Sequence, residues 1–129
     1  MEIVENPSKV ALICSYCIQM LLVLLFLATA IANLMGTKTA TASAAAFGYN
    51  ENSLHYLGAA LLLSTCLYVI PKYMILGAIL LTGWLGGAIA THVIQDAPFM
   101  ISCLPIVCGL LVWLSVILRS RAYSAFLPW

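Results

Sequence analysis

Long apolar runs alternate with short polar segments along this chain. Four runs stand out, at about residues 10–35, 53–70, 74–94 and 100–118. Each is close to the roughly 20 residues that an α-helix needs to cross the hydrocarbon core of a bilayer. Strands of a membrane barrel would be about half as long and would alternate in polarity, and these runs do not alternate. Because the backbone must satisfy its own hydrogen bonds inside a bilayer, the pattern predicts four transmembrane helices.

The composition agrees with this pattern. Of the 129 residues, 64% are hydrophobic and only 7% are charged, whereas soluble domains carry about 25% charged residues. We therefore expect a single membrane domain over residues 1–129, folded as an all-α transmembrane four-helix bundle in contact with the lipid bilayer. The net charge of +1 leaves no basic patch, so nucleic acid is not an expected partner.

The basic residues predict the orientation of the bundle. With four spans both termini lie on one side, and that side carries Lys9, Lys72, Arg119 and Arg121. The other side carries only Lys38. Because cytoplasmic segments are enriched in Lys and Arg, this distribution predicts cytoplasmic termini, with the bacterial inner membrane as the location.

The connections between the runs have distinct patterns. Residues 37–50 are rich in alanine, which predicts a short outer interfacial helix between the first two spans, ended by Gly48. A flexible linker is the alternative for this segment. Pro71 and Lys72 predict a tight inner turn, and Pro105 predicts a kink in the fourth span.

The end of the chain is expected to leave the membrane. Arg119 and Arg121 should stop the fourth span. The aromatic residues Tyr123, Phe126 and Trp129 then suit an amphipathic tail at the headgroups, where tyrosine and tryptophan are enriched.

Histidines and carboxylates gather at the outer ends of the second and third spans. Glu51 and His55 are four residues apart, and so are His92 and Asp96, so each pair shares a helix face. In a compact bundle the two pairs would lie at the same depth and form one polar cluster. The simplest interpretation is that each histidine bonds its own carboxylate. The alternatives are a site for a quinone headgroup and a metal site, with His92 as the strongest single candidate.

Small residues line one face of the third span. Gly83, Gly87 and Thr91 are four residues apart, and Gly77 lies earlier in the same span. Small residues on such a face let another helix approach closely. We expect them to pack the helices of the bundle against one another, and packing against a second subunit is the alternative.

The cysteines do not indicate redox chemistry. Cys14 and Cys17 form a CxxC pair, but the predicted orientation places them beside the reducing cytosol, where such a pair does not persist as a disulfide. Buried cysteines also pack as small apolar residues. We therefore predict no catalytic residue.

The second half of the chain carries a family resemblance. Its pieces are Leu57-Gly58, Tyr68-Val69-Ile70-Pro71, the run Leu81–His92, and the ending from Val112-Trp113-Leu114 to Phe126-Leu127-Pro128. In order and spacing this block resembles the DoxX-like family of four-helix membrane proteins. The family takes its name from a subunit of a quinone-linked sulfur oxidoreductase, so the resemblance implies a quinone as a possible cofactor.

The first helix departs from the family's pattern. Many relatives read Asp-Ala-x-x-Lys-Leu near its outer end, and the matching stretch here is Thr29-Ala30-Ile31-Ala32-Asn33-Leu34. Thr29 and Asn33 thus stand in place of a charged pair, and any activity that depends on that pair would be lost.

Taken together, these observations favour a non-catalytic accessory or scaffold subunit of a membrane assembly, bound to a protein partner or to a second copy of the chain. The alternative is a quinone-binding membrane subunit of an oxidoreductase. Its site would be the polar cluster of His92, His55, Asp96 and Glu51. Whether the protein is an enzyme stays open, and the sequence leans against it.

Overall fold

The computed structural model describes residues 7–124, with the side chains of residues 9–121. The elements in chain order are α1 (Pro7–Met35), α2 (Lys38–Ala46), α3 (Glu51–Val69), the single 3₁₀ turn η1 (Pro71–Tyr73), α4 (Met74–Ile94) and α5 (Phe99–Ser124). This part of the chain contains no strand, so the all-α prediction is confirmed. Each of the four predicted apolar runs corresponds to one long helix.

Three helical segments are long and apolar enough to cross a membrane. They are Lys9–Met35, Pro71–Ile94 and Phe99–Arg121. The fourth long helix, α3, has 19 residues, but its first turns include Glu51 and His55, which lower its hydropathy.

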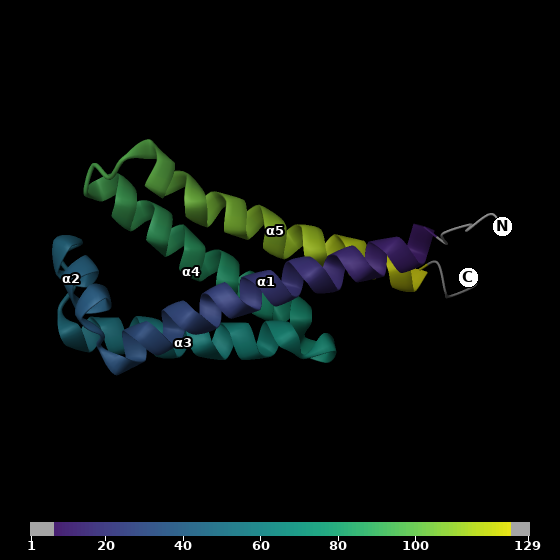
Figure 1. Ribbon diagram of the computed structural model, residues 1–129, viewed down its shortest axis with the longest axis horizontal. Coiled ribbons are helices and arrows are strands. Elements are labelled where there is room, and N and C mark those ends of the chain that lie inside the picture. Colours follow the sequence, from purple (N-terminus) through teal and green to yellow (C-terminus); the bar gives the residue numbers. More distant parts are fainter. Residues whose placement is uncertain (1–6, 125–129) are drawn as a thin grey trace.

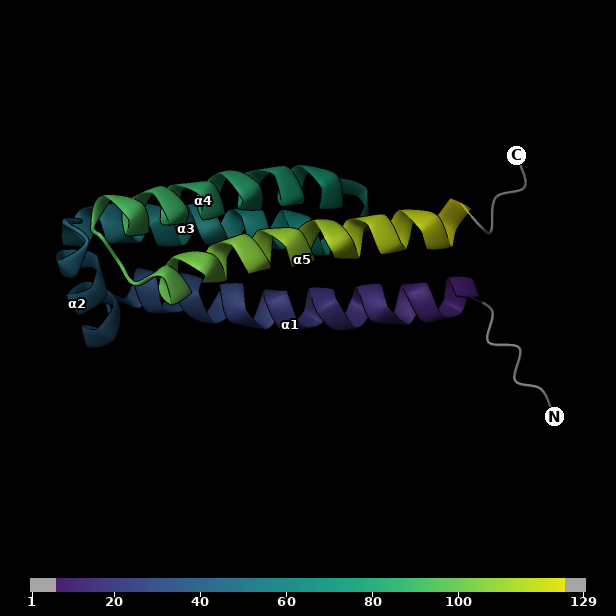
Figure 2. The same cartoon turned by 90° about the horizontal axis from the view of Figure 1, so that it is seen from above.

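The four long helices are arranged so that each packs against two others. Helix α1 packs against α3 and α5, and α4 also packs against α3 and α5. Helices α3 and α4 meet at η1 and diverge toward α2 (Figure 1). The start of α1 and the end of α5 lie together at the opposite end (Figures 1 and 2). We call these the α2 end and the terminal end of the molecule.

Glycines mark the closest approaches between helices. A Cβ atom at Gly77 would lie 2.2 Å from the backbone nitrogen of Tyr68, and one at Gly58 would lie 3.1 Å from the carbonyl oxygen of Ala30. Helix α4 therefore packs directly on the backbone of α3, and α3 packs closely on α1.

The predicted short helix after the first span is present as α2. The side chain of Thr37 caps its start by accepting a hydrogen bond from the backbone N–H of Ala40, at 3.3 Å. The helix ends at Ala46, and Gly48 follows with a φ of +78°. This left-handed conformation is one that glycine adopts without strain.

The last turns of α5 carry the two arginines that were expected to stop the fourth span. The helix continues past Arg119 and Arg121 to Ser124, and Arg119 is buried, with only 4% of its surface exposed. Arg119 lies among the other helices, where its guanidinium group contacts Gln19 of α1 and Met74 of α4, as described below. Pro105 is inside α5, which remains one helix. The predicted aromatic tail, comprising Phe126, Trp129 and the side chain of Tyr123, lies outside the described residues.

Candidate functional site

A pocket of about 360 Å³ lies between α3 and α4, toward the α2 end where these helices diverge. Leu54 and Leu57 of α3 line it, together with Asn33 of α1 and Ala44 of α2. Four helices thus contribute to one mostly apolar cavity.

The α4 side of the pocket is made of small residues. Gly83 and Gly87 both line it, and a Cβ atom at either would have no other atom within 4 Å. These two glycines therefore do not pack helices of this chain together, contrary to the sequence-based expectation. Their spacing does place them on one face of α4, but that face meets the pocket rather than a neighbouring helix.

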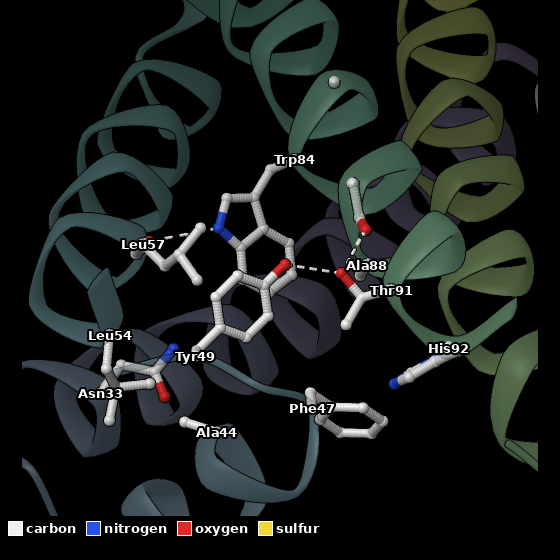
Figure 3. A pocket seen from close by; sticks show the side chains of 12 residues that line it. Asn33, Ala44, Phe47, Tyr49, Leu54, Leu57, Trp84, Ala88, Thr91 and His92 are labelled. Atoms are coloured by element: carbon white, nitrogen blue, oxygen red, sulfur yellow. Dashed lines mark hydrogen bonds between the residues drawn. The ribbon is translucent and has the colours of Figure 1, made fainter. Parts of the chain in front are cut away.

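The segment after α2 closes the pocket at the α2 end. The hydroxyl groups of Tyr49 and Thr91 are hydrogen-bonded at 2.6 Å, and the side-chain amide of Gln95 donates to the carbonyl oxygen of Phe47 at 3.4 Å. The Phe47 ring also packs against the ring of His92, with 5.0 Å between centroids (Figure 3). Three contacts therefore tie this segment to the end of α4.

Trp84 bounds the pocket at its deep side. Its indole N–H donates to the carbonyl oxygen of Leu57 at 3.1 Å, which links α4 to α3 (Figure 3). The indole nitrogen is therefore satisfied, and the ring presents an apolar surface to the cavity.

His92 is the residue of the predicted cluster that lines the pocket. Its Nδ1 atom is buried and has no hydrogen-bond partner among the described residues. The bond predicted between His92 and Asp96 is absent. Helix α4 ends at Ile94 and Asp96 has a φ of +50°, so the four-residue spacing no longer places the two side chains on one helix face. The Asp96 side chain is exposed instead.

Glu51 and His55 lie together at the end of α1, outside the pocket lining. Nδ1 of His55 lies 3.2 Å from the carbonyl oxygen of Asn33. A Cβ atom at Gly36 would be 3.6 Å from both Oε1 of Glu51 and Cε1 of His55. Within the described residues, no group of three or more His, Cys, Asp or Glu side chains is placed to hold a metal ion.

The model of the DoxX-like family matches residues 17–115. The chain belongs to the DoxX-like family. This confirms the resemblance seen in the sequence over residues 57–115 and extends it toward the N-terminus, across most of α1 and every residue of the pocket. The end of the resembling block, after residue 115, lies outside the match. Asn33 is one of those pocket residues. Neither the curated proteins nor the solved structures contain a significant match.

Membership in this membrane-associated family agrees with the three apolar helices. This DoxX-like protein is therefore a small membrane protein in contact with lipid, as the sequence predicted.

A set of hydrogen-bonded polar side chains lies inside this DoxX-like protein near the terminal end. The sequence did not lead us to expect it. Arg119 donates from Nη2 to Oε1 of Gln19 at 2.6 Å, and Gln19 donates from Nε2 to the carbonyl oxygen of Tyr68 at 2.8 Å. The Tyr68 hydroxyl is hydrogen-bonded to that of Ser115, and Ser15 donates to the carbonyl oxygen of Ser115 at 2.7 Å. We call these five residues the buried polar cluster.

The cation of this cluster has few partners. Nη1 of Arg119 contacts Sδ of Met74 at 3.4 Å, and the Tyr16 ring lies 4.1 Å from Cζ. Nε has no hydrogen-bond partner within residues 7–124. The signal that could have revealed the cluster is the spacing of Ser15 with Gln19 and of Ser115 with Arg119, since polar residues four apart within apolar helices usually face a partner.

Proposed function

We propose that this DoxX-like protein is a binding protein of the membrane, whose pocket holds one lipid-soluble molecule with a head the size of a quinone ring. The observation that carries the proposal is that His92 lines the pocket while its Nδ1 has no hydrogen-bond partner among the described residues. A buried polar atom without a hydrogen bond costs about 1–3 kcal/mol. A ligand carbonyl or hydroxyl group that bonds this nitrogen, once a rotation of the imidazole exposes it to the pocket, would offset this cost.

The size and lining of the pocket support the same proposal. Its volume of about 360 Å³ falls within the usual range for small-molecule sites, which begins near 300 Å³. Such sites are mostly apolar with a few polar groups that orient the ligand. Here Asn33 and His92 supply those groups, and a quinone carries two carbonyl oxygens that an amide and an imidazole can bond.

The test is to purify the protein in mild detergent, extract it with organic solvent and identify bound small molecules by mass spectrometry. We expect a stoichiometric lipid-soluble compound with the parent protein and its loss from His92→Leu. That variant should remain folded, because it replaces an unpartnered polar group by an apolar one. Asp96→Asn is the matched control and should keep the compound. An empty parent protein, or a His92→Leu variant that retains the compound, would contradict the proposal.

A second candidate function is the non-catalytic accessory or scaffold role. One observation favours it: the exposed face of α4 around Gly83, Gly86 and Gly87 leaves open space, and small residues of this kind allow a partner helix to pack closely. The same purification separates the candidates, since this role requires a stoichiometric protein partner or a second copy and no bound small molecule.

For the topology, we propose that α3 crosses the membrane with the other three long helices, as a four-helix bundle with cytoplasmic termini in a bacterial inner membrane. Lys9, Arg119 and Arg121 belong to the terminal end, and Lys72 lies in η1, at the ends of α3 and α4 that are away from α2. Lys38 begins α2. This distribution supports the proposed orientation.

A labelling experiment tests the orientation. In a background without the native cysteines, Ala40→Cys should react with a membrane-impermeant maleimide added to intact cells. Ser120→Cys should react only after the cells are opened. The reverse pattern would show that the orientation is inverted.

A further inference from the structure

The polar groups of the pocket lie at one end of it. Asn33, Tyr49 and His92 lie toward the α2 end, while Trp84 lies farther from it (Figure 3). Gly83 directly precedes Trp84 on α4. Gly83 and His92 are nine residues apart on α4, about 14 Å at 1.5 Å per residue. The pocket is therefore long enough to separate a polar head from an apolar part.

The pocket changes from polar to apolar in the direction that runs from the membrane surface to its middle. Helix α4 has 21 residues, or about 31 Å, close to the roughly 30 Å of a hydrocarbon core. Gly83 then lies near the middle of the membrane and His92 near its surface. The pocket thus changes from polar to apolar in the same direction as a lipid.

The pocket is open on its glycine side and closed at the α2 end. Gly83 and Gly87 are exposed, and no atom lies within 4 Å of a Cβ placed on either. At the α2 end, by contrast, Tyr49 is bonded to Thr91 and Phe47 packs on His92. An apolar chain attached to the head would therefore leave the pocket sideways into lipid.

The lining also limits the charge of the head. It contains no Asp, Glu, Lys or Arg side chain. A phosphate or carboxylate placed there would be buried without a counter-charge, which is strongly unfavourable. An uncharged carbonyl or hydroxyl head has no such cost.

From these observations we propose that the ligand is a single-tailed amphiphile with an uncharged head, held between Asn33 and His92, and a tail that passes Gly83 into the bilayer. This inference rests on the proposed binding function and adds the orientation, the charge and the tail of the ligand. It distinguishes such a molecule from phospholipids and fatty acids, whose heads are charged.

The test compares two probes that share one head. Decylubiquinone has a ten-carbon tail, and 2,3-dimethoxy-5-methyl-1,4-benzoquinone has none. Binding is followed by quenching of Trp84 fluorescence in a protein that also carries Trp113→Phe and Trp129→Phe. The two probes partition differently into detergent, but this partitioning is the same for every protein variant. Affinities are therefore compared between variants for one probe at a time.

We expect Gly83→Leu to weaken binding of decylubiquinone about tenfold or more and to change binding of the tailless quinone less than about twofold. Gly83→Val should act in the same direction and serves if the leucine variant does not fold. Gly86→Leu is the matched control, because Gly86 is exposed on the same helix but does not line the pocket. It should change neither affinity.

The other outcomes are equally decisive. Equal weakening of both probes by Gly83→Leu would place the head rather than the tail at Gly83 and would overturn this inference, while leaving the binding function standing. Unchanged binding of both probes would also overturn it. A similar loss with Gly86→Leu would indicate a helix contact instead of a tail. If neither probe binds the parent protein, the proposed function fails and this inference fails with it.

Discussion

Gly77→Ala is expected to destabilise the protein strongly, whereas Gly83→Ala and Gly87→Ala are not. The new Cβ at position 77 would lie 2.2 Å from the backbone nitrogen of Tyr68 and 2.4 Å from its Cα. A backbone cannot move aside as a flexible side chain can, so α3 and α4 must separate. Inserting even one methyl group into a packed core typically costs about 1–3 kcal/mol, and sometimes more.

The matched variants should behave in the opposite way. A Cβ at Gly83 or Gly87 meets no atom within 4 Å, and alanine is favoured over glycine inside a helix by roughly 0.5–1 kcal/mol. Thermal unfolding of the three purified variants in one detergent measures the difference. We expect a midpoint several degrees lower for Gly77→Ala and an unchanged or higher midpoint for the other two. If all three variants melt together, the close contact between α4 and α3 is not as described.

The fold could be predicted from the sequence because its signals are local. The apolar length of residues 74–94 is enough by itself to predict a helix. The alanines before Gly48 favour a short helix whatever the segment packs against. The glycines of α4 show the limit of such signals. Spacing tells which residues share a helix face, but only the arrangement of the other helices decides that Gly77 meets α3 while Gly83 meets a pocket.

The candidate site was predicted only in part for the same reason. His92 stands out in the sequence because it is a titratable group at the end of an apolar run, and it lines the pocket. The predicted hydrogen bond between His92 and Asp96 was wrong. Residues four apart share a face only within a helix, and α4 ends at Ile94, between the two. Phe47 and Tyr49 are pocket residues that no local pattern marks, since they reach His92 and Thr91 only through the path of the chain after α2.

Substitution of Gln19 in the buried polar cluster is expected to lower the stability of the protein strongly. Arg119 is a cation with 4% of its surface exposed, and within residues 7–124 its one oxygen acceptor is the side chain of Gln19, at 2.6 Å. A hydrogen bond to a charged group contributes about 1.5–3 kcal/mol. Gln19→Leu removes this bond and also the bond from Gln19 to the carbonyl oxygen of Tyr68. We therefore expect Gln19→Leu to be severely destabilising.

A double variant shows whether the unpaired cation is the cause. Replacing both members of a buried polar pair by apolar residues is often tolerated, whereas removing one member leaves the other uncompensated. Gln19→Leu combined with Arg119→Met should thus unfold at a higher temperature than Gln19→Leu alone, although a second residue has been changed. Gln19→Glu, which places a carboxylate beside Arg119, should also be more stable than Gln19→Leu. The single variant Arg119→Met completes the comparison. If adding Arg119→Met to Gln19→Leu lowers the unfolding temperature as much as Arg119→Met does in the parent protein, the two side chains act independently. The hydrogen bond between them would then not hold α1 to α5.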